Sequence, residues 1–372
     1  MPQNIPIHFR HFKNCMQSIA VLMPLVQGAD VVHEPCDGIM LYSFATQQAQ
    51  DVFHEVGMSK KRPIFIAGGP HPSARPEETL RFFDYVVIGE GEETLPELIR
   101  TIQNKGDVSS VRGIAFKDKN GIVLTDRRDP VMLDSYPPFG IDGIRSTIEI
   151  TRGCPFSCAY CQTPQLFGQM MRHRSIDEIV RYSKYLKDVR FTSPNAFAYG
   201  SDGTSPRIEK IEALLKNLPR KNIFFGTFPS EVRPEFINDR ILELVSDHCA
   251  NTALCMGGQS GSQRILDLIK RGHTVDDIIA GVEKCLQHGF TPVVDFIFGL
   301  PGETEDDQLE TLRLIKWLTG KGGTVHSHYF MQLPGTGFEN STPAPLSAQV
   351  ERTMGKLALA GKTTGVWYRA YP

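Results

Sequence analysis

The sequence predicts an α/β protein in which a Rossmann-like domain is followed by a partial (β/α)6 barrel of the TIM type. Short apolar runs typical of strands alternate with amphipathic runs typical of helices along most of the 372 residues, which favours parallel sheets. Glycine-rich or polar loops follow several of the strand-like runs, at the positions where such sheets and barrels bind ligands. At about 100 to 200 residues per domain, the length allows two or three domains.

The composition is that of an ordinary globular protein, with 41% apolar and 22% charged residues. A net charge of −2 provides no overall field that would attract phosphate backbones or acidic membranes. The longest apolar runs, residues 19–26 and 293–300, are much shorter than the roughly 20 residues of a membrane span. We therefore expect a cytoplasmic protein without nucleic acid or membrane among its partners.

The first domain is predicted to span residues 1–138. Strands are expected at 5–9, 38–43, 63–67 and 85–88, and helices at 15–26, 47–56, 76–83 and 94–102. A β-hairpin is expected within residues 107–134, turning at Asn120 and Gly121, before a proline-containing connector at 136–139.

Two glycine loops follow successive strands of this domain. Residues 67–72 read Ala-Gly-Gly-Pro-His-Pro, and residues 88–92 read Ile-Gly-Glu-Gly-Glu. Adjacent glycines let the backbone approach a bulky ligand because no Cβ atoms intervene. A tight turn between strand and helix is the alternative interpretation of the first loop.

A cysteine loop opens the second domain, directly after a strand-like run at 147–151. Cys154, Cys158 and Cys161 have a C-x3-C-x2-C spacing, with Phe156 and Tyr160 between them. A 4Fe–4S cluster of the ferredoxin type takes four cysteines and a structural zinc site four ligands, so three thiolates suit a cluster with one open iron. Zinc, a disulfide and chance spacing are the alternatives. The remaining cysteines, expected to be reduced, are Cys15, Cys36, Cys249, Cys255 and Cys285.

The second domain is predicted to span residues 139–335. Further strands are expected at 188–192, 223–227, 251–256, 292–298 and 325–332, and Ser175 is expected to cap a helix. Glu231 and Arg233 flank one position and could face the same side, with a surface ion pair as the alternative. Residues 257–262, Gly-Gly-Gln-Ser-Gly-Ser, resemble a nest of backbone amides before a helix at 264–269. Residues 336–372 are predicted to form a C-terminal extension with a helix at 348–359.

These motifs, in this order, resemble the radical SAM family that carries an N-terminal cobalamin (B12)-binding domain, methyltransferase type. The resemblance implies three cofactors: a 4Fe–4S cluster held by the three cysteines, S-adenosylmethionine (SAM) chelated by the open iron, and cobalamin. In the family, the segment matching 259–262 holds SAM, often through a glutamate where this chain has Gln259. The candidate cofactor-binding residues are Ser43, Thr46, Gly68, Gly69, Pro70, His71, Gly89, Glu90, Glu92, Tyr160, Gln162, Ser193, Asn195, Glu231, Arg233, Gln259, Ser260 and Ser262.

The D-x-H-x-x-G motif, through which some B12 proteins supply a histidine to cobalt, is absent from the sequence. The resemblance therefore implies cobalamin whose own base is displaced and is not replaced by a histidine. His71 is expected to form hydrogen bonds within its loop rather than to bind cobalt.

The resemblance implies a C-methyltransferase: a 5'-deoxyadenosyl radical removes hydrogen from an unactivated carbon, and methylcobalamin delivers the methyl group. The compact size and the loop at 193–200 resemble a methanogen group whose members methylate side chains of methyl-coenzyme M reductase, such as a glutamine. This implies a protein or peptide substrate and a low-potential electron donor. A cyclase or ring-contracting enzyme on a small molecule is one alternative. A corrinoid and iron–sulfur redox sensor without turnover is another, although a sensor needs no SAM-binding loop.

Overall fold

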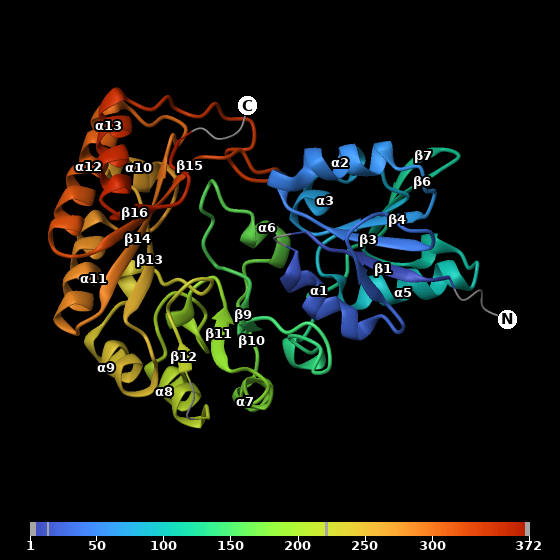
Figure 1. Cartoon of the computed structure of the whole chain (residues 1–372), viewed down its shortest axis with the longest axis horizontal. Helices are drawn as coiled ribbons and strands as arrows, with labels where there is room; N and C mark the ends of the chain where they lie inside the picture. The colour runs from blue at the N-terminus through green and yellow to red at the C-terminus, as the bar shows by residue number, and fades with distance from the viewer. Residues whose placement is uncertain (1–4, 13–14, 220–221, 369–372) are drawn as a thin grey trace. The chain divides into compact units, whose positions relative to one another are not determined.

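The computed structural model describes residues 5–12, 15–219 and 222–368. It divides into two compact units, residues 1–147 with 165–167 and residues 148–164 with 168–372 (Figure 1). Each unit is described by itself below. The domain boundaries after residues 138 and 335 remain predictions.

A seven-stranded sheet forms the centre of the first unit. Its order is β2 (Asp30–Val32), β1 (Ile7–Arg10), β3 (Ile39–Ser43), β4 (Ile64–Gly68), β5 (Tyr85–Val87), β6 (Ile114–Asp118) and β7 (Gly121–Leu124). The first five strands are parallel, and β6 and β7 form an antiparallel hairpin. The predicted parallel sheet and hairpin are confirmed, but the turn lies one residue earlier, at residues 119–120. The three-residue β2 was not predicted, because so short a run carries no periodic signal.

Both faces of this sheet are apolar because its strands are covered by helices on both sides. Ile39 and Leu41 pack in one cluster with residues of α1 (Met16–Leu22) and α5 (Gly91–Gln103). Met40 and Tyr42, which point the opposite way, pack in a second cluster with α2 (Ala49–Met58). Figure 1 shows α2 on one side of the sheet and α1 and α5 on the other. This continuous apolar pattern is typical of buried parallel strands.

The second unit contains two parallel sheets. One holds β8 (Ile148–Glu149), β11 (Asp188–Thr192) and β12 (Asn222–Phe224). The other holds β13 (Ala253–Gln259), β14 (Thr291–Phe298), β15 (Thr324–Tyr329) and β16 (Thr363–Thr364). A parallel bridge between Val232 and Met256 connects the loop after β12 to β13. The six strands β8, β11, β12, β13, β14 and β15 follow the predicted order and confirm the partial barrel, whereas β16 was not predicted.

Helices cover the outer side of these strands, including α8 (Ile208–Asn217), α9 (Asp239–His248), α11 (Val275–Gln287) and α12 (Glu305–Gly320) (Figure 1). Thr274 and Thr304 begin α11 and α12 with capping boxes that use Asp277 and Asp307. Ser175 caps α7 (Ile176–Ser183) as predicted, by accepting a hydrogen bond from the Glu178 amide at 3.4 Å.

The inner side of the second sheet carries polar side chains. Along β14, Val294, Phe296 and Phe298 are fully buried, as expected for residues that face the helices. Asp295 lies on the opposite face, level with Gly257 of β13 and His326 of β15. Asp295 therefore places a carboxyl group in the middle of β14, on the face opposite the helices.

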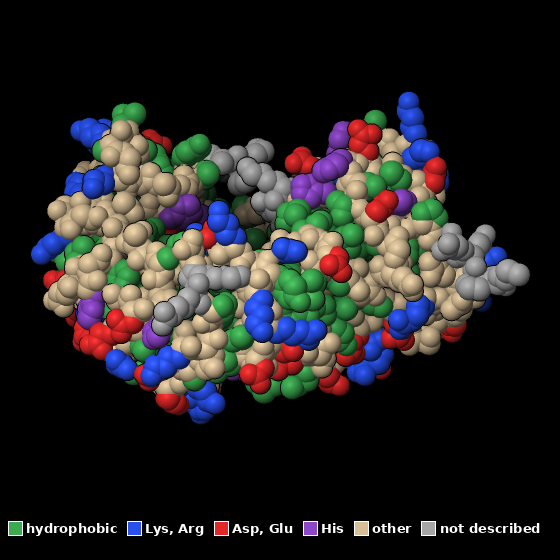
Figure 2. Space-filling view, turned by 60° about the horizontal axis from the view of Figure 1, so that its bottom comes forward, with side chains coloured by type: hydrophobic (Ala, Val, Ile, Leu, Met, Phe, Trp, Pro, Cys, Tyr) green, Lys and Arg blue, Asp and Glu red, His purple; other side chains and the backbone are tan. Residues whose placement is uncertain are grey.

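Charged side chains of both signs are interspersed over the face drawn in Figure 2, in agreement with the small net charge. Among the described residues, no helix combines the length and apolar character needed to cross a membrane.

Candidate functional site

The cysteine loop follows β9 (Thr151–Arg152), which pairs with β10 (Arg172–His173). Backbone hydrogen bonds fix its shape: the Cys154 amide donates to Gly168 O at 3.1 Å, and the Cys161 amide donates to Cys158 O at 3.0 Å. The Ala159 amide donates to Ile269 O at 3.0 Å, so the loop is tied to the end of α10 (Gln263–Leu268).

The three thiols lie close enough to interact electrostatically. Burial raises the pKa of Cys154, and the nearby Cys161 and Cys158 raise it further. All eight cysteines are free thiols, so the disulfide alternative is wrong. Within the described part of the chain, no three His, Cys, Asp or Glu side chains are grouped as ligands of a single ion. A 4Fe–4S cluster takes each cysteine on a separate iron, so three neighbouring thiols that do not meet at one point fit it.

Tyr160 and Gln162 flank the last cysteine. Burial raises the pKa of Tyr160, which keeps the phenol neutral beside Arg271, Cys158 and Cys161. Gln162 is buried, and its Nε2 donates to Pro334 O at 2.8 Å. The structure therefore uses the Gln162 amide to hold the cysteine loop to a distant segment of the same unit.

Arg233 packs directly on the cysteine loop. Its guanidinium carbon lies 3.5 Å from the centre of the Phe156 ring, and its Nε lies 2.5 Å from Glu235 Oε1. Only 3% of Arg233 is exposed, so the surface ion-pair alternative is wrong, and its partner is Glu235 rather than Glu231. Burial, with Arg271 and Arg233 nearby, lowers the pKa of His273 to about 2, so this imidazole is neutral.

Glu231 faces a different partner. Its side chain forms a hydrogen bond with that of Asp295 on β14, and burial followed by the Glu231 charge raises the pKa of Asp295 to about 9. The two carboxyl groups therefore hold a proton at neutral pH. The expectation that Glu231 and Arg233 act together is corrected, because Glu231 pairs with Asp295 whereas Arg233 pairs with Glu235.

Ser193 and Asn195 join two loops inside the unit. Ser193 Oγ lies 2.9 Å from Ser230 Oγ, and Asn195 Oδ1 accepts from the Phe197 amide at 3.2 Å and the Arg233 amide at 3.4 Å. Asn195 Nδ2 is buried and has no hydrogen-bond acceptor among the described residues. This amide remains available to a bound molecule.

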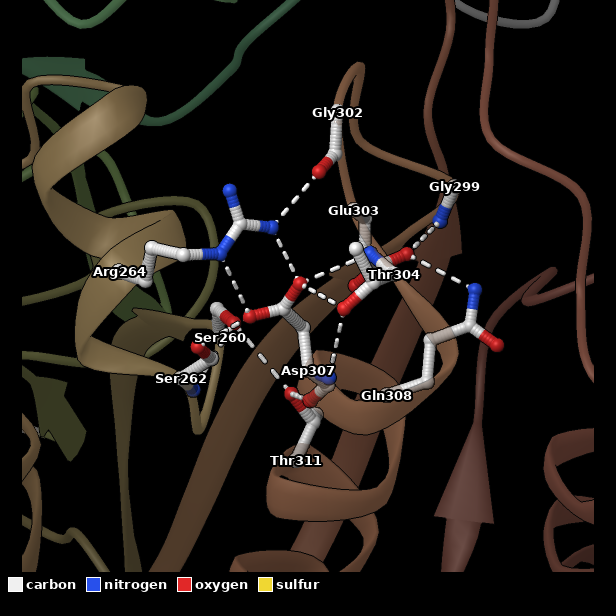
Figure 3. A network of polar contacts seen from close by, with 10 residues as sticks. All are labelled: Ser260, Ser262, Arg264, Gly299, Gly302, Glu303, Thr304, Asp307, Gln308 and Thr311. Atoms are coloured by element: carbon white, nitrogen blue, oxygen red, sulfur yellow. Dashed lines mark hydrogen bonds and ion pairs between the residues drawn. The ribbon is translucent and has the colours of Figure 1, made fainter.

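The serines of the 257–262 loop face α12 (Figure 3). Ser262 Oγ donates to Asp307 Oδ1 at 2.7 Å, and Ser260 Oγ lies 3.3 Å from Thr311 Oγ1. The Gly261 amide donates to Thr311 Oγ1 at 2.9 Å, and the Ser262 amide donates to Ser260 Oγ at 3.1 Å. Ser260 and Ser262 therefore hold the loop against α12, and their predicted contact with SAM stays a prediction.

Asp307 is the centre of this network. It also receives the Arg264 guanidinium, with Nε to Oδ1 at 3.1 Å, and the Thr304 hydroxyl at 2.6 Å (Figure 3). Burial alone would raise the pKa of Asp307, but hydrogen bonds from Arg264, Ser262 and Thr304 hold it well below its usual range. Its carboxylate is therefore a permanent acceptor that fixes the loop.

Gln259 differs from the two serines. It ends β13 with a φ of +70°, a conformation that a residue other than glycine adopts rarely and at some energetic cost. Its side-chain amide forms no hydrogen bond within the described part of the chain. The predicted contact of Gln259 with a cofactor thus has both an unusual backbone and a free polar group in its favour.

The predicted cobalamin loops gather at the ends of β3, β4 and β5 in the first unit. Gly69 has a φ of +95°, and a Cβ there would lie 2.9 Å from Ser43 Oγ and 3.0 Å from Phe44 O. The Gly89 amide donates to Ser73 Oγ at 2.9 Å, and Glu90 accepts from the Val131 amide at 2.7 Å. The remaining predicted residues of these loops are Thr46 before α2, Gly68 at the end of β4, Pro70 in α3 (Pro70–Ala74) and the buried Glu92 in α5.

The His71 side chain forms one hydrogen bond, to the loop after β3, and its buried Nε2 has no hydrogen-bond partner among the described residues. Its Nδ1 lies 3.3 Å from Thr46 Oγ1, and its ring stacks on Phe44 at 5.9 Å between centroids. Only 5% of the residue is exposed, and burial lowers its pKa. These contacts hold the imidazole inside the loop.

Two family descriptions match the chain. The B12 binding domain matches residues 29–99, and the radical SAM superfamily matches residues 148–315. This chain carries a B12-binding domain and a radical SAM domain. Its cofactors are accordingly a 4Fe–4S cluster, SAM and cobalamin, and the residues around the cysteine and glycine loops fit them.

Proteins similar to this chain carry different names. An uncharacterised methyltransferase of Pyrococcus horikoshii is 26% identical over 68% of this chain and 58% of its own length. A tRNA-2-methylthio-N(6)-dimethylallyladenosine synthase of Pseudoalteromonas translucida is 26% identical over 80% of this chain and 64% of its own length. The chain thus spans about three fifths of the length of these curated relatives.

Two solved structures share the fold. The radical SAM methyltransferase TsrM from Kitasatospora setae, with cobalamin and a 4Fe–4S cluster bound, has a TM-score of 0.68 at 14% identity, covering 91% of this chain and 77% of TsrM. The cobalamin-dependent radical SAM enzyme OxsB has a TM-score of 0.66 at 15% identity, covering 84% of this chain and 52% of OxsB. These likenesses confirm the predicted α/β architecture.

Arg271 and Asp295 were missed by the sequence reasoning. Asp295 interrupts an apolar strand, and a lone carboxylate within such a run was a usable signal. Arg271 follows a helix in the sequence Lys-Arg-Gly-His, which is indistinguishable from an ordinary basic helix end.

Proposed function

We propose that this protein is a cobalamin-dependent radical SAM C-methyltransferase that acts on an unactivated carbon of a protein or peptide, with a glutamine of methyl-coenzyme M reductase as the substrate to test first. The observation that carries the proposal is the presence of a B12 binding domain and a radical SAM domain in one chain. When bound, the cluster and SAM supply a radical that removes hydrogen from carbon, and cobalamin supplies the methyl group.

The chain's own residues have binding and positioning roles in this proposal. Cys154, Cys158 and Cys161 hold the cluster, and the backbone at Gly68 and Gly69 leaves room for the corrinoid. Gln259 and Asn195 offer amide groups, which are free among the described residues, to SAM or to the substrate. The buried Arg233 and the Ser262–Asp307 contact keep the surrounding loops in fixed positions.

The test is anaerobic turnover with methyl-deuterated SAM and a glutamine peptide of methyl-coenzyme M reductase, followed by mass spectrometry. A C-methyltransferase yields S-adenosylhomocysteine and 5'-deoxyadenosine in comparable amounts, and the peptide gains a methyl group that retains all three deuterons. With deuterium on the substrate carbon instead, the label should appear in 5'-deoxyadenosine. Methylated peptide without this transfer would contradict direct hydrogen abstraction.

The alternatives give different products in the same experiment. A cyclase or ring-contracting enzyme forms 5'-deoxyadenosine without matching S-adenosylhomocysteine. A redox sensor forms neither catalytically. If the peptide stays unmodified while both SAM products accumulate, the proposed methyltransferase reaction stands, but the proposed peptide substrate is wrong.

A further inference from the structure

Arg271 is a half-buried cation beside the cysteine loop. Its Nη1 lies 3.9 Å from Cys158 Sγ, and its Nη2 donates to Gly257 O at 2.9 Å. Its Nε is buried and has no hydrogen-bond partner within the described residues. No carboxylate of those residues lies within ion-pair distance of the guanidinium.

A second guanidinium lies next to it. Arg233 Nη2 donates to the backbone carbonyl of Arg271 at 2.5 Å, but the charge of Arg233 is paired with Glu235. The nearby His273 is neutral because its pKa is so low. Of the two guanidinium groups that contact the cysteine loop, Arg271 is therefore the one without a paired anion.

The backbone is shaped to admit this cation. A Cβ on Gly257 would lie 2.7 Å from Arg271 Nη2, so a larger residue at that strand position would displace the guanidinium. The Ile269 carbonyl, two residues before Arg271, accepts the hydrogen bond from Ala159 in the cysteine loop. The cysteine loop and the Arg271 segment are thus fixed to each other.

A buried charge is costly unless an opposite charge compensates for it. We propose that Arg271 is the counter-charge of the iron–sulfur cluster, a positioning residue that hydrogen-bonds a ligand sulfur and raises the cluster's reduction potential. Reduction adds negative charge to the cluster, and a fixed guanidinium stabilises the reduced state more than the oxidised one. The inference rests on the proposed role of Cys154, Cys158 and Cys161 as cluster ligands.

The test compares Arg271→Met and Arg271→Lys with wild type and with Arg181→Met, which removes an exposed arginine from α7. The full chain is purified anaerobically, its cluster is reconstituted without SAM or cobalamin, and iron and sulfide are counted. A redox titration followed by electron paramagnetic resonance then gives the cluster's reduction potential.

In Arg271→Met, the ratio of reduced to oxidised cluster at a fixed potential should fall at least tenfold. For a one-electron couple this corresponds to a reduction potential lowered by about 59 mV. Arg271→Lys keeps the positive charge but lacks the planar guanidinium, so its cluster should have a reduction potential between those of wild type and Arg271→Met. Arg181→Met should match wild type. An unchanged potential in an Arg271→Met protein with a full cluster would overturn the inference.

Thermal unfolding of the cluster-free proteins covers the case in which Arg271→Met fails to retain iron. Without the cluster, wild type keeps a half-buried cation with no carboxylate of the described residues within ion-pair distance, so Arg271→Met should lose at most the contribution of its one hydrogen bond, to Gly257 O. A cluster-free Arg271→Met that is clearly less stable than wild type would assign the side chain to packing alone and refute the inference. A wild-type protein that binds no iron would instead refute the cluster assignment in the proposed function.

Discussion

The carboxyl group of Asp295 forms a hydrogen bond with that of Glu231 on the inner side of the second unit's sheet. Asp295 comes from the middle of β14, whereas Glu231 comes from the loop after β12. Two carboxyl groups that share a hydrogen bond cannot both ionise cheaply, so the pair retains a proton. Stability should therefore depend on pH through this pair.

Asp295→Asn should make the folding stability of the protein less dependent on pH. The folded pKa of about 9 lies above the ordinary value of 3.8, so the unfolded chain loses its proton first. The stability linked to this proton is present below about pH 4 and is lost as the pH rises toward 9, at up to about 1.4 kcal/mol per pH unit. Urea denaturation between pH 5 and pH 8.5 should show that the free energy of unfolding falls with rising pH in wild type and falls less in Asp295→Asn. The exposed Asp276→Asn is the control, and a parallel shift in both variants would contradict the assignment.

Replacing Cys154, Cys158 and Cys161 together by alanine should abolish iron binding and the formation of 5'-deoxyadenosine. The control replaces Cys249 and Cys285, whose pKa values burial raises to about 12, as expected of inert thiols outside the site. Iron and sulfide analysis after anaerobic reconstitution gives the result. A full cluster in the triple variant would exclude these cysteines as its ligands.

Gly68→Ala should weaken cobalamin binding without destabilising the protein. A Cβ at Gly68 would make only an ordinary 3.7 Å contact with Val87, whereas Gly69→Ala is strained by its positive φ and by the 2.9 Å approach to Ser43 Oγ. Absorbance titration should show lower affinity in both variants, with a lower unfolding midpoint in Gly69→Ala alone. Unchanged affinity in Gly68→Ala would place the corrinoid elsewhere.

The bound cobalamin should show a base-off spectrum that His71→Ala leaves unchanged, because the imidazole is already held by Thr46 and Phe44. Absorbance and electron paramagnetic resonance spectra of the cobalt would detect a change of axial ligand. A base-on spectrum, or one that depends on His71, would refute this expectation.

Ser262→Ala should lower the free energy of unfolding by about 1 to 3 kcal/mol, because it removes a buried hydrogen bond to the ionised Asp307. Chemical denaturation without cofactors measures the effect. Ser183→Ala, which removes a buried hydroxyl that donates to Val180 O, is the control for a neutral hydrogen bond and should cost less. If Ser262→Ala instead weakened SAM binding at unchanged stability, the supporting role of this serine would be wrong.

Periodicity predicted much of the fold because its strands are buried and its helices are amphipathic. Short pairings depend on tertiary context, which explains why β2, β10 and β16 escaped notice. The cysteine loop was recognisable because thiol spacing is a local property. The orientation of Ser260 and Ser262 was not, because it depends on Thr311 and Asp307, more than 40 residues later. Arg271 could not be distinguished for the same reason, since its neighbour Cys158 is remote in sequence.

The two-residue β16 has a consequence for protein engineering. Val325 and His326 of β15 pair with Thr363 and Thr364, and Gly365 lies so close that a Cβ there would be 2.3 Å from Ser327 O. The chain after residue 336 thereby occupies the hydrogen-bonding edge of the second sheet. An excised barrel that ended at Gly335 would present the bare edge of β15 to other molecules, and such edges invite strand-to-strand aggregation.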